Sequence, residues 1–269
     1  MRQVTVRDVL EWVDGIAPFA LAEDYDNVGL LAGDPREEVQ KILFCVDATP
    51  EAAEEAVGCG AQLILSHHPL MFGGIRRVDY TAAEGKALRA ILGGKLNLIA
   101  AHTNLDKASG GIADSLAAAL HLRDIVSAGH PASCVRIGTL PSSMGAAELA
   151  GFVAERLRAE VRRYGDADVP ISRVAVGPGA GGDGIEAADR AGAQCYVVGE
   201  IKHHELLWGC GQGLVVLEAG HYATEAAGMK ALYERFRTMA VREEWDAEPL
   251  WFSKAPFSGA LRPETESLR

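Results

Sequence analysis

The sequence has few of the features that mark secreted or membrane-spanning proteins. Its five cysteines form no Cys-x-x-Cys pair, and their odd number argues against a framework of disulfides. No segment reaches the ~18 consecutive apolar residues of a membrane helix, and the N-terminus lacks the apolar core of a signal peptide. We therefore expect a cytoplasmic protein without a membrane partner.

Positive charge is also scarce. Lys and Arg number 26 against 37 Asp and Glu, so the formal net charge at pH 7 is −11. A surface of this sign repels a phosphate backbone, which argues against nucleic acid as a partner. The remaining composition, with 48% hydrophobic and 23% charged residues, is typical of a globular chain and excludes a disordered or fibrous one. With 269 residues, the chain can bury one large core or two modest ones.

Strands and helices are expected to alternate along the first half. Apolar runs predict buried strands over 41–47, 62–65 and 96–101. The helical spacing of apolar residues, with capping and stop signals, predicts helices over 5–13, 50–59, 82–92 and 111–119. This βαβ order is typical of an α/β fold with a mostly parallel sheet.

The second half repeats this order. The tripeptide Gly-Ala-Gln begins at Gly60 before one strand and at Gly192 before another, a separation of 192 − 60 = 132 residues. Around the second copy, a strand, a helix and a strand are predicted over 173–176, 184–191 and 195–198. We therefore predict an α/β protein of two related lobes that arose by internal duplication, with boundaries at 1–127 and 128–269.

Glycine and proline interrupt the pattern in three places. The halves are separated by a break that contains Gly129, Pro131, Pro141 and Gly145. The glycine-rich segment 177–184 lacks the Gly-Lys-Ser/Thr ending of a P-loop and the spacing of a dinucleotide fingerprint, so it predicts a flexible turn between a strand and a helix. After Ser253, proline and glycine with mixed charge predict a loop or a docked extension.

Histidines and carboxylates follow the predicted strands. The strand over 62–65 is followed by His67 and His68, the strand over 96–101 by Asp106, and a strand over 214–217 by His221. Four residues further, Glu225 lies near the start of a helix expected to run to about Arg235, which places it on the same face as His221. Because ligands of open α/β sheets bind beyond the carboxyl ends of the strands, we expect these five side chains to converge.

The residue types indicate a metal centre. Imidazole nitrogen and carboxylate oxygen suit zinc, iron, manganese or nickel, and five candidates from three segments exceed what one closed tetrahedral site needs. The surplus indicates two divalent ions that share bridging groups. Some alternatives stay open: Asp106 alone fits a turn or cap, and His102 either ligates a metal or hydrogen-bonds to a ligand. The pair His67 and His68 converges only if the strand has turned before it, which Pro69 favours.

A second cluster lies at the edge of the other lobe. Glu200 follows the strand over 195–198 and His204 comes four residues later, so both could face the metals as general acid or base. The alternative is a solvated helix start with a favourable N-terminal glutamate. Lys202 suits a small anionic substrate, and Asp47 closes the first strand on the same edge, where it would support a ligand.

Five distinctive segments are spread over most of the chain: Glu23-Asp24-Tyr25-Asp26-Asn27-Val28-Gly29-Leu30, Ser66-His67-His68-Pro69-Leu70, Ala101-His102-Thr103-Asn104-Leu105-Asp106, Gly199-Glu200-Ile201-Lys202-His203-His204 and Gly220-His221-Tyr222-Ala223-Thr224-Glu225. With these segments the chain resembles the NIF-three-like, or NGG-interacting-factor-like, family of dinuclear metal centre proteins, some of which are named GTP cyclohydrolase 1 type 2 homologues. Longer relatives insert a domain between the lobes, and this chain is too short for it. We therefore expect only a brief connection over 129–170.

The resemblance implies a NIF-three-like fold of two related α/β lobes, assembled as a homohexamer in the shape of a hollow toroid. It also implies a dinuclear site that faces the cavity of the ring. The family's ligands carry over onto the same five residues: His67, His68, Asp106, His221 and Glu225.

Two functions are compatible with these features. The first is a metal-dependent hydrolase of a small anionic or nucleotide substrate, in which two ions activate a bridging water. The resemblance suggests GTP cyclohydrolase-type ring opening, with phosphoester cleavage as another possibility, and Glu200 or His204 would move protons in either reaction. The sequence offers no assignable base-stacking aromatic or base-binding carboxylate. The second is a noncatalytic hexamer that binds metal for storage, delivery, assembly or regulation; a ring that threads nucleic acid is disfavoured by the net charge of −11.

Overall fold

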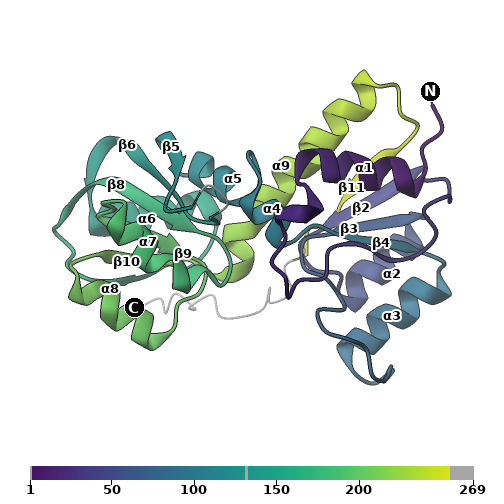
Figure 1. The fold of residues 1–269 in the computed structure, drawn as a ribbon, viewed down its shortest axis with the longest axis horizontal. Helices are drawn as coiled ribbons and strands as arrows, with labels where there is room; N and C mark the ends of the chain where they lie inside the picture. Colours follow the sequence, from purple (N-terminus) through teal and green to yellow (C-terminus); the bar gives the residue numbers. More distant parts are fainter. Residues whose placement is uncertain (1, 131–132, 255–269) are drawn as a thin grey trace, which may run out of the picture.

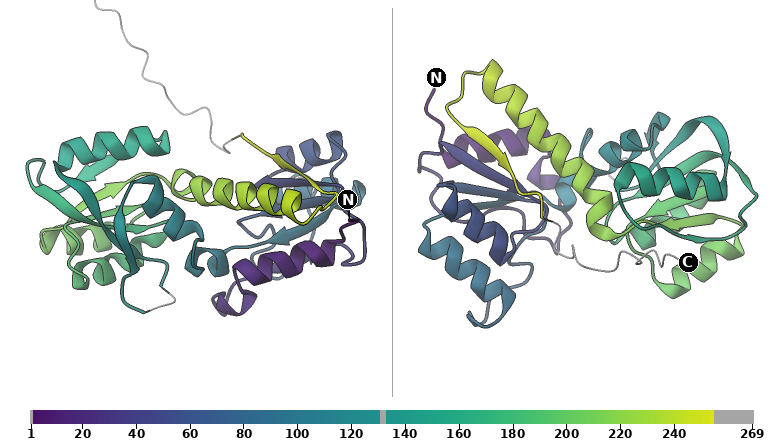
Figure 2. Two further views of the ribbon diagram at one scale, coloured as in Figure 1. Left: turned by 90° about the horizontal axis from the view of Figure 1, so that it is seen from above. Right: turned by 180° about the vertical axis from the view of Figure 1, so that it is seen from behind.

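The computed structural model describes residues 2–130 and 133–254 of the chain. Within that part, the strands form two sheets, each at the centre of one lobe, and helix α9 (His221–Arg242) passes from one lobe to the other (Figure 1). Views from above and from behind show the same passage (Figure 2). The predicted α/β class with two lobes is confirmed.

The first sheet consists of four parallel strands and one antiparallel edge strand. In spatial order its strands are β1 (Gly29–Ala32), β4 (Asn97–Ala100), β3 (Leu63–Ser66), β2 (Lys41–Cys45) and β11 (Glu248–Trp251). The pairings from β4 to β11 are parallel, and β1 pairs antiparallel with β4. Because β11 joins this sheet only after the chain has passed through the second lobe, the sheets do not divide the chain at the expected boundary of 127 and 128.

Side chains of the first sheet pack on both of its faces. Ile42 and Phe44 contact the apolar sides of α1 (Val6–Ile16) and α9. Leu43 and Cys45 point to the opposite face and pack with α2 (Pro50–Gly58) and α3 (Ala83–Gly93). Since helices cover both faces, the central strands need apolar residues at successive positions, which is why they appear in the sequence as unbroken apolar runs.

The second sheet has a parallel centre and antiparallel margins. In spatial order its strands are β5 (Arg123–Ser127), β6 (Arg136–Gly145), β8 (Pro170–Gly177), β9 (Cys195–Val198), β10 (Val215–Glu218) and β7 (Arg162–Tyr164). Only β8, β9 and β10 are parallel to one another, whereas β5, β6 and β7 pair antiparallel. The mostly parallel pairing that the sequence predicts therefore holds for the centre of this sheet and not for its margins.

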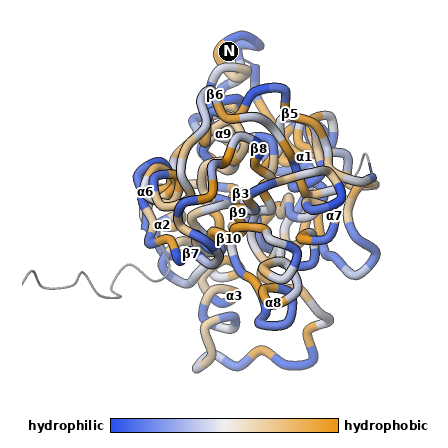
Figure 3. The backbone as a smooth tube through the Cα atoms, turned by 90° about the vertical axis from the view of Figure 1, so that its left-hand side faces the viewer, coloured by the Kyte–Doolittle hydropathy of each residue, from blue (hydrophilic) through white to orange (hydrophobic). Residues whose placement is uncertain are grey.

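Helices also cover both faces of the second sheet. One face packs against α5 (Ile112–Ala119) and α6 (Ala146–Leu157). The other packs against α7 (Ile185–Arg190) and α8 (His203–Gly211). Hydrophobic residues gather in the strands between these helices, and the outer turns are largely hydrophilic (Figure 3).

The two lobes share a hydrogen-bonding detail that follows the predicted duplication. Gln62 Oε1 accepts hydrogen bonds from the backbone N–H groups of Gln40 and Lys41, both at 2.9 Å. Gln194, which lies 132 positions later, accepts from the N–H groups of residues 172 and 173, at 2.8 and 3.0 Å. These donors are also 132 positions beyond 40 and 41, so the same side chain binds the equivalent pair of backbone N–H groups in each lobe.

Two expectations about element lengths are wrong. The segment 129–170 is not a brief connection, because it contains all of β6, α6 and β7. Helix α9 does not end near Arg235 but continues to Arg242, since Phe236, Met239 and Ala240 extend its buried stripe. The tail after Ser253, predicted as a loop or docked extension, lies outside the described residues from 255 onward.

Within residues 2–130 and 133–254, no helix is both long enough and apolar enough to cross a bilayer.

Candidate metal centre

The histidine pair follows β3 at a point where the chain has left the sheet. β3 ends at Ser66, and the backbone N–H groups of His67 and His68 both donate to the carbonyl oxygen of Val46, at 3.1 and 3.0 Å. The hydroxyl of Ser66 donates to the carbonyl of His68 at 2.8 Å and closes a tight turn. The two rings therefore face the same region, with centroids 4.9 Å apart. On a continuing strand they would point to opposite faces.

Asp106 is carried by α4 (Thr103–Lys107), a short helix that follows β4. The buried side chain of Asn104 holds this helix: it accepts from the backbone N–H of His102 at 2.9 Å and donates to the carbonyl of Ala17 at 2.7 Å. A helix of five residues has little stability of its own, so these tertiary bonds fix its position. As a result, Asp106 Oδ1 lies 3.4 Å from His67 Nε2.

The second lobe contributes the first turn of α9. Gly220 precedes this helix with a φ of 88°, a conformation that favours glycine, and turns the chain from β10 into the helix. His221 and Glu225 then lie one turn apart on the same face, with His221 Nε2 3.0 Å from Glu225 Oε1. Glu225 is only 2% exposed. Its carboxylate therefore needs partners inside the protein.

The five candidate ligands come together between the two lobes. Glu225 Oε1 is 3.6 Å from His67 Nε2, and Glu225 Oε2 is 3.2 Å from His68 Nε2. His68 Nε2 is also 3.1 Å from His221 Nε2. Potential ligand atoms within 4.8 Å of one another form two groups that share His68: one with His67 and His102, and one with His221 and Glu225.

Unsatisfied buried atoms make this point a candidate cation site. Within the described part of the chain, three buried polar atoms here lack a hydrogen-bond partner: His67 Nε2, Asp106 Oδ1 and Glu225 Oε2. A buried polar atom without a partner costs about 1–3 kcal/mol. A divalent cation would satisfy all three, and their imidazole nitrogen and carboxylate oxygen are donors typical of zinc, iron, manganese and nickel sites. The residues present therefore fit a metal.

The other ring nitrogen of each histidine is held by the protein. The three Nδ1 contacts are His67 with the carbonyl of Ala101 at 2.8 Å, His68 with Asp47 at 2.7 Å, and His221 with Glu200 at 3.3 Å. Each acceptor favours a proton on Nδ1, which leaves the lone pair on Nε2 toward the centre. Asp47 thus supports a candidate ligand, as its place after the first strand suggested.

Opposing effects act on the protonation of the centre. Burial disfavours charge on His68, but Asp47 and Glu225 outweigh it and raise the pKa of His68 to about 10. Burial raises the pKa of Asp106 to about 6, although the nearby His67 lowers it. Without a cation, protons therefore occupy lone pairs that a metal would use. Metal binding must release these protons and weaken as the pH falls.

The two candidate proton-transfer residues have different positions. The Glu200 side chain is 61% exposed and reaches His221 Nδ1 at 3.3 Å, so it joins the centre through that ring. His204 is exposed in the first turn of α8 and is not among the residues that line the cavity at the centre. At this helix start, Glu205 accepts a hydrogen bond from the backbone N–H of Lys202 at 2.8 Å. The solvated helix start, left open by the sequence, therefore describes His204.

A cavity of about 500 Å³ opens onto the centre between the lobes. Tyr25 and Phe72 lie on its first-lobe side with ring centroids 6.1 Å apart, and both rings are at least half exposed. Asp183 lines the side that belongs to the second lobe. The described residues around this cavity include no Lys or Arg. Lys202 therefore does not line the space in which an anionic substrate would bind. Sequence reasoning missed these aromatic and acidic groups because they lie in loops without a periodic pattern.

The glycine-rich turn of 177–184 packs directly against the ligands. The backbone N–H of Gly179 donates to Thr224 Oγ1 at 3.0 Å. A Cβ atom on Gly179 would lie only 2.2 Å from Glu225 Oε1, and its φ of 58° also favours glycine. The turn between strand and helix is thus present as predicted, but its glycines serve close approach to a candidate ligand.

Asp26 and His102 form a second contact that the sequence did not assign. His102 Nδ1 lies 2.8 Å from Asp26 Oδ1, and the Asp26 side chain is fully buried. The His102 ring stacks edge-on beside His67 and His68, with centroid distances of 5.1 and 5.3 Å. Burial, with a further effect of His67, lowers the pKa of His102 to about 4. The segment around Asp26 was visible as a motif, but its partner is 76 residues away.

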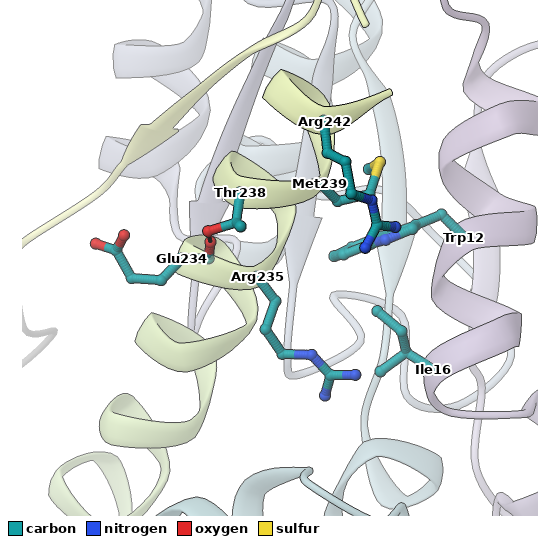
Figure 4. A pocket seen from close by; sticks show the side chains of 7 residues that line it. All are labelled: Trp12, Ile16, Glu234, Arg235, Thr238, Met239 and Arg242. Atoms are coloured by element: carbon teal, nitrogen blue, oxygen red, sulfur yellow. Dashed lines mark hydrogen bonds between the residues drawn. The ribbon is translucent and has the colours of Figure 1, made fainter. Parts of the chain in front are cut away.

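A second cavity, of about 490 Å³, lies between α1 and the C-terminal part of α9. Trp12 and Ile16 line it from α1, and Arg235 and Arg242 line it from α9 (Figure 4). The described residues that line it include no histidine or cysteine. It shares no residue with the cavity at the metal centre and contributes nothing to that site.

The chain is similar to known proteins along most of its length. Residues 4–256 match the family model described as Duf34/NIF3 (NGG1p interacting factor 3). A protein of Streptomyces coelicolor named GTP cyclohydrolase 1 type 2 homolog is 31% identical over 250 residues, covering 89% of this chain and 88% of that protein. A protein of the same name from Clostridium acetobutylicum is 32% identical over 227 residues, covering 82% of this chain and 85% of that protein.

Solved structures share the fold. The structure of the Staphylococcus aureus hypothetical protein SA1388 matches with a TM-score of 0.90 and 25% identity, covering 95% of this chain and 99% of that one. Reduced HcgD from Methanocaldococcus jannaschii matches with a TM-score of 0.79 and 25% identity, covering 94% of this chain and 100% of that one. The two-lobed architecture is therefore common to all three chains.

Proposed function

Because the chain belongs to the Duf34/NIF3 family, we propose that it is a metal-dependent hydrolase with a dinuclear centre. The proposed ligands are His67, His68, Asp106, His221 and Glu225. The observation that carries the proposal is the convergence of two donor groups on His68, beside buried lone pairs that no hydrogen bond uses. When bound, two divalent ions would lower the pKa of a water molecule and polarise the substrate.

The protein's own groups suit two neighbouring ions. One oxygen of Glu225 lies near His67 and His221 and the other lies near His68, which is the arrangement that a bridging carboxylate needs. Glu200 holds the proton on His221 Nδ1 and, because it is largely exposed, can exchange protons with water. The exposed position of His204 outside the cavity favours Glu200 as the residue that moves protons.

The cavity supports a nucleotide as the substrate. Tyr25 and Phe72 offer aromatic rings on which a planar base can stack, and Asp183 offers an acceptor for the N–H groups of a base. Since no described Lys or Arg lines the cavity, the negative groups of the substrate would depend on the ions for charge neutralisation. The name of the Streptomyces coelicolor relative makes GTP the first nucleotide to test, with ring opening as the reaction.

Metal-loaded protein provides the test. Zinc, iron(II), manganese and nickel would be loaded separately, and release of formate and dihydroneopterin triphosphate from GTP would be measured beside phosphate release from a panel of phosphoesters. We expect turnover with at least one ion, its loss in Asp106→Ala, and its retention in His203→Ala, a control at an exposed histidine of α8. No turnover of any substrate by metal-loaded wild type would contradict the hydrolase.

The alternative is a noncatalytic metal-binding homohexamer. The same fold and ligand set would serve it, because storage or delivery needs binding without reaction. It predicts reversible metal exchange with no turnover, in a particle of six chains by light scattering. The cavity beside the ligands favours the hydrolase, since a storage site has no need of aromatic rings beside its ions.

A further inference from the structure

The His102 ring lies against the metal centre without belonging to the five proposed ligands. It offers a ring nitrogen within 4.8 Å of nitrogen atoms of His67 and His68. Its Nδ1 is already bonded to Asp26 at 2.8 Å, so the nitrogen that remains for the centre is Nε2. Phe72 covers the ring from the cavity side, with centroids 6.0 Å apart. The ring is therefore held between the cavity and the two histidines.

Asp26 uses both of its oxygens. Oδ1 accepts from His102 Nδ1 and from the backbone N–H of Asn27, each at 2.8 Å. Oδ2 accepts from the backbone N–H of Thr103 at 3.1 Å and from the Thr103 hydroxyl at 2.5 Å. A fully buried carboxylate with this many donors is fixed in orientation. It ties the loop before β1 to the start of α4 and sets the angle of the His102 ring.

The chemistry of a carboxylate determines the tautomer. An ionised carboxylate only accepts hydrogen bonds, so the neutral imidazole must carry its proton on Nδ1 and its lone pair on Nε2. In the other tautomer, the lone pairs of Nδ1 and Oδ1 would repel each other and Nε2–H would point toward the cations. Asp26 therefore decides whether His102 offers the centre a lone pair or a proton.

We propose that Asp26 is a positioning residue that holds His102 with its Nε2 lone pair toward the metal centre, where His102 serves as a sixth protein donor. The inference rests on the metal centre of the proposed function but not on any reaction. It assigns a physical role to the distinctive segment around Asp26. None of the five proposed ligands comes from this segment.

An asparagine at position 26 separates this role from simple packing. Asp26→Asn keeps the shape but has one acceptor oxygen and one NH₂ donor. If the amide oxygen serves the N–H of Thr103, the NH₂ group faces His102 Nδ1 and forces the proton onto Nε2. The tautomer then changes although the side chain has the same size, an effect that loss of packing would not produce.

The experiment combines nitrogen NMR of the histidine rings with zinc competition against a chelator. We expect the Nδ1–H tautomer for His102 in the wild type. In Asp26→Asn we expect Nε2–H and a zinc affinity lower by about 10- to 100-fold, the usual effect of losing support for a ligand. His102→Ala should lose affinity to a similar degree, and adding it to Asp26→Asn should cost little more. Asp24→Asn, an exposed aspartate two residues away, is the matched control and should match the wild type.

Two outcomes would overturn the inference. One is Nε2–H on His102 in the wild type, and the other is unchanged zinc affinity in His102→Ala. If Asp26→Asn does not fold, His102→Ala still tests the inference. Wild-type protein that binds no zinc would instead contradict the proposed function, so the two failures are distinguishable.

Discussion

His68 of the first lobe and His221 of the second face each other with their Nε2 atoms 3.1 Å apart. Carboxylates hold the opposite side of both rings, Asp47 for His68 and Glu200 for His221, which favours lone pairs on the two facing nitrogens. Two lone pairs at this distance repel unless a proton or a cation stabilises them. The contact between the lobes therefore depends on what occupies the centre.

Loss of one carboxylate should cost one ion, and loss of the other should cost both. Asp106 lies beside His67, whereas Glu225 lies beside His67, His68 and His221. We expect Asp106→Asn to retain about one ion per chain and Glu225→Gln to retain none after dialysis, by elemental analysis. Glu234→Gln, on the same helix with a side chain that is 42% exposed, is the control. Equal ion counts in the two ligand variants would contradict a bridging role for Glu225.

The stability of metal-free protein should fall as the pH rises from about 6.5 to 10. The folded pKa of His68, about 10, exceeds its ordinary 6.5, so protonated His68 stabilises the fold fully below its ordinary pKa and loses this contribution as the pH passes its folded pKa. Below this range, the raised pKa of Asp106 and the lowered pKa of His102 have opposite effects on stability, because neutral His102 favours the fold as the pH rises above about 4.

Zinc should reverse this trend, because deprotonated ligands bind the ion more tightly. The increase in Tm on adding zinc should therefore be larger at pH 8 than at pH 5. Thermal melts of metal-free and zinc-loaded protein across the pH range measure both effects. An equal increase at both pH values would contradict competition between protons and metal.

A methyl group on Gly179 should disturb the ligands and not only the turn. The added Cβ would meet Glu225 Oε1, and the positive φ of 58° costs any L-residue roughly 1–2 kcal/mol. Gly213→Ala is a suitable control, because Gly213 has a φ of 90° but open space around its Cβ position. We expect both variants to lose stability in chemical denaturation, Gly179→Ala the more because of its contact with Glu225, and only Gly179→Ala to lose zinc affinity. Unaltered zinc affinity would show that the loop does not hold Glu225.

The duplicated glutamines should have equal effects on stability. Gln62→Ala and Gln194→Ala each remove the acceptor of two backbone N–H groups at equivalent positions of the two lobes. At about 1 kcal/mol for each hydrogen bond, both variants should lose roughly 1–3 kcal/mol in denaturant titrations. Gln212→Ala, at an exposed position, should lose little. A large loss of stability in only one of the two variants would show that the two glutamines, although equivalent in position, do not stabilise their lobes equally.

Local patterns were sufficient for the central elements of the fold. The repeat of Gly-Ala-Gln located β3 and β9 with the same offset of 132 that separates Leu63 from Cys195. Both repeats begin with a glycine at positive φ, 70° at Gly60 and 80° at Gly192. This conformation explains why glycine follows the end of each helix. Apolar runs find buried parallel strands because both faces of these strands are covered.

The margins of the sheets could not be predicted in this way. β6 contains Pro141 and a register shift between Thr139 and Met144, so it looked like a break in the sequence. β11 is assigned to the first sheet only by pairing with β2, about two hundred residues earlier. Such strands depend on long-range pairing, for which a local window of sequence carries no signal.

The candidate site also contains predictable and unpredictable parts. The convergence of the candidate ligands that follow strands was predictable, because strand ends at one sheet edge must lie close together. Asp26, Tyr25 and Phe72 were not, since their contacts with the centre depend on how loops fold over it. The exposed position of His204 was equally unpredictable, because spacing alone cannot tell which way the first turn of α8 faces.

Metal occupancy is the central claim, and anomalous scattering from crystals of untreated protein tests it most directly. Data at the absorption edges of zinc, iron, manganese and nickel would give the identity, the number and the ligands of the ions together. We predict two ions per chain, bound by His67, His68, Asp106, His221 and Glu225, with Glu225 between them and His102 as the further donor. A single ion, or ions bound away from these residues, would contradict the dinuclear centre.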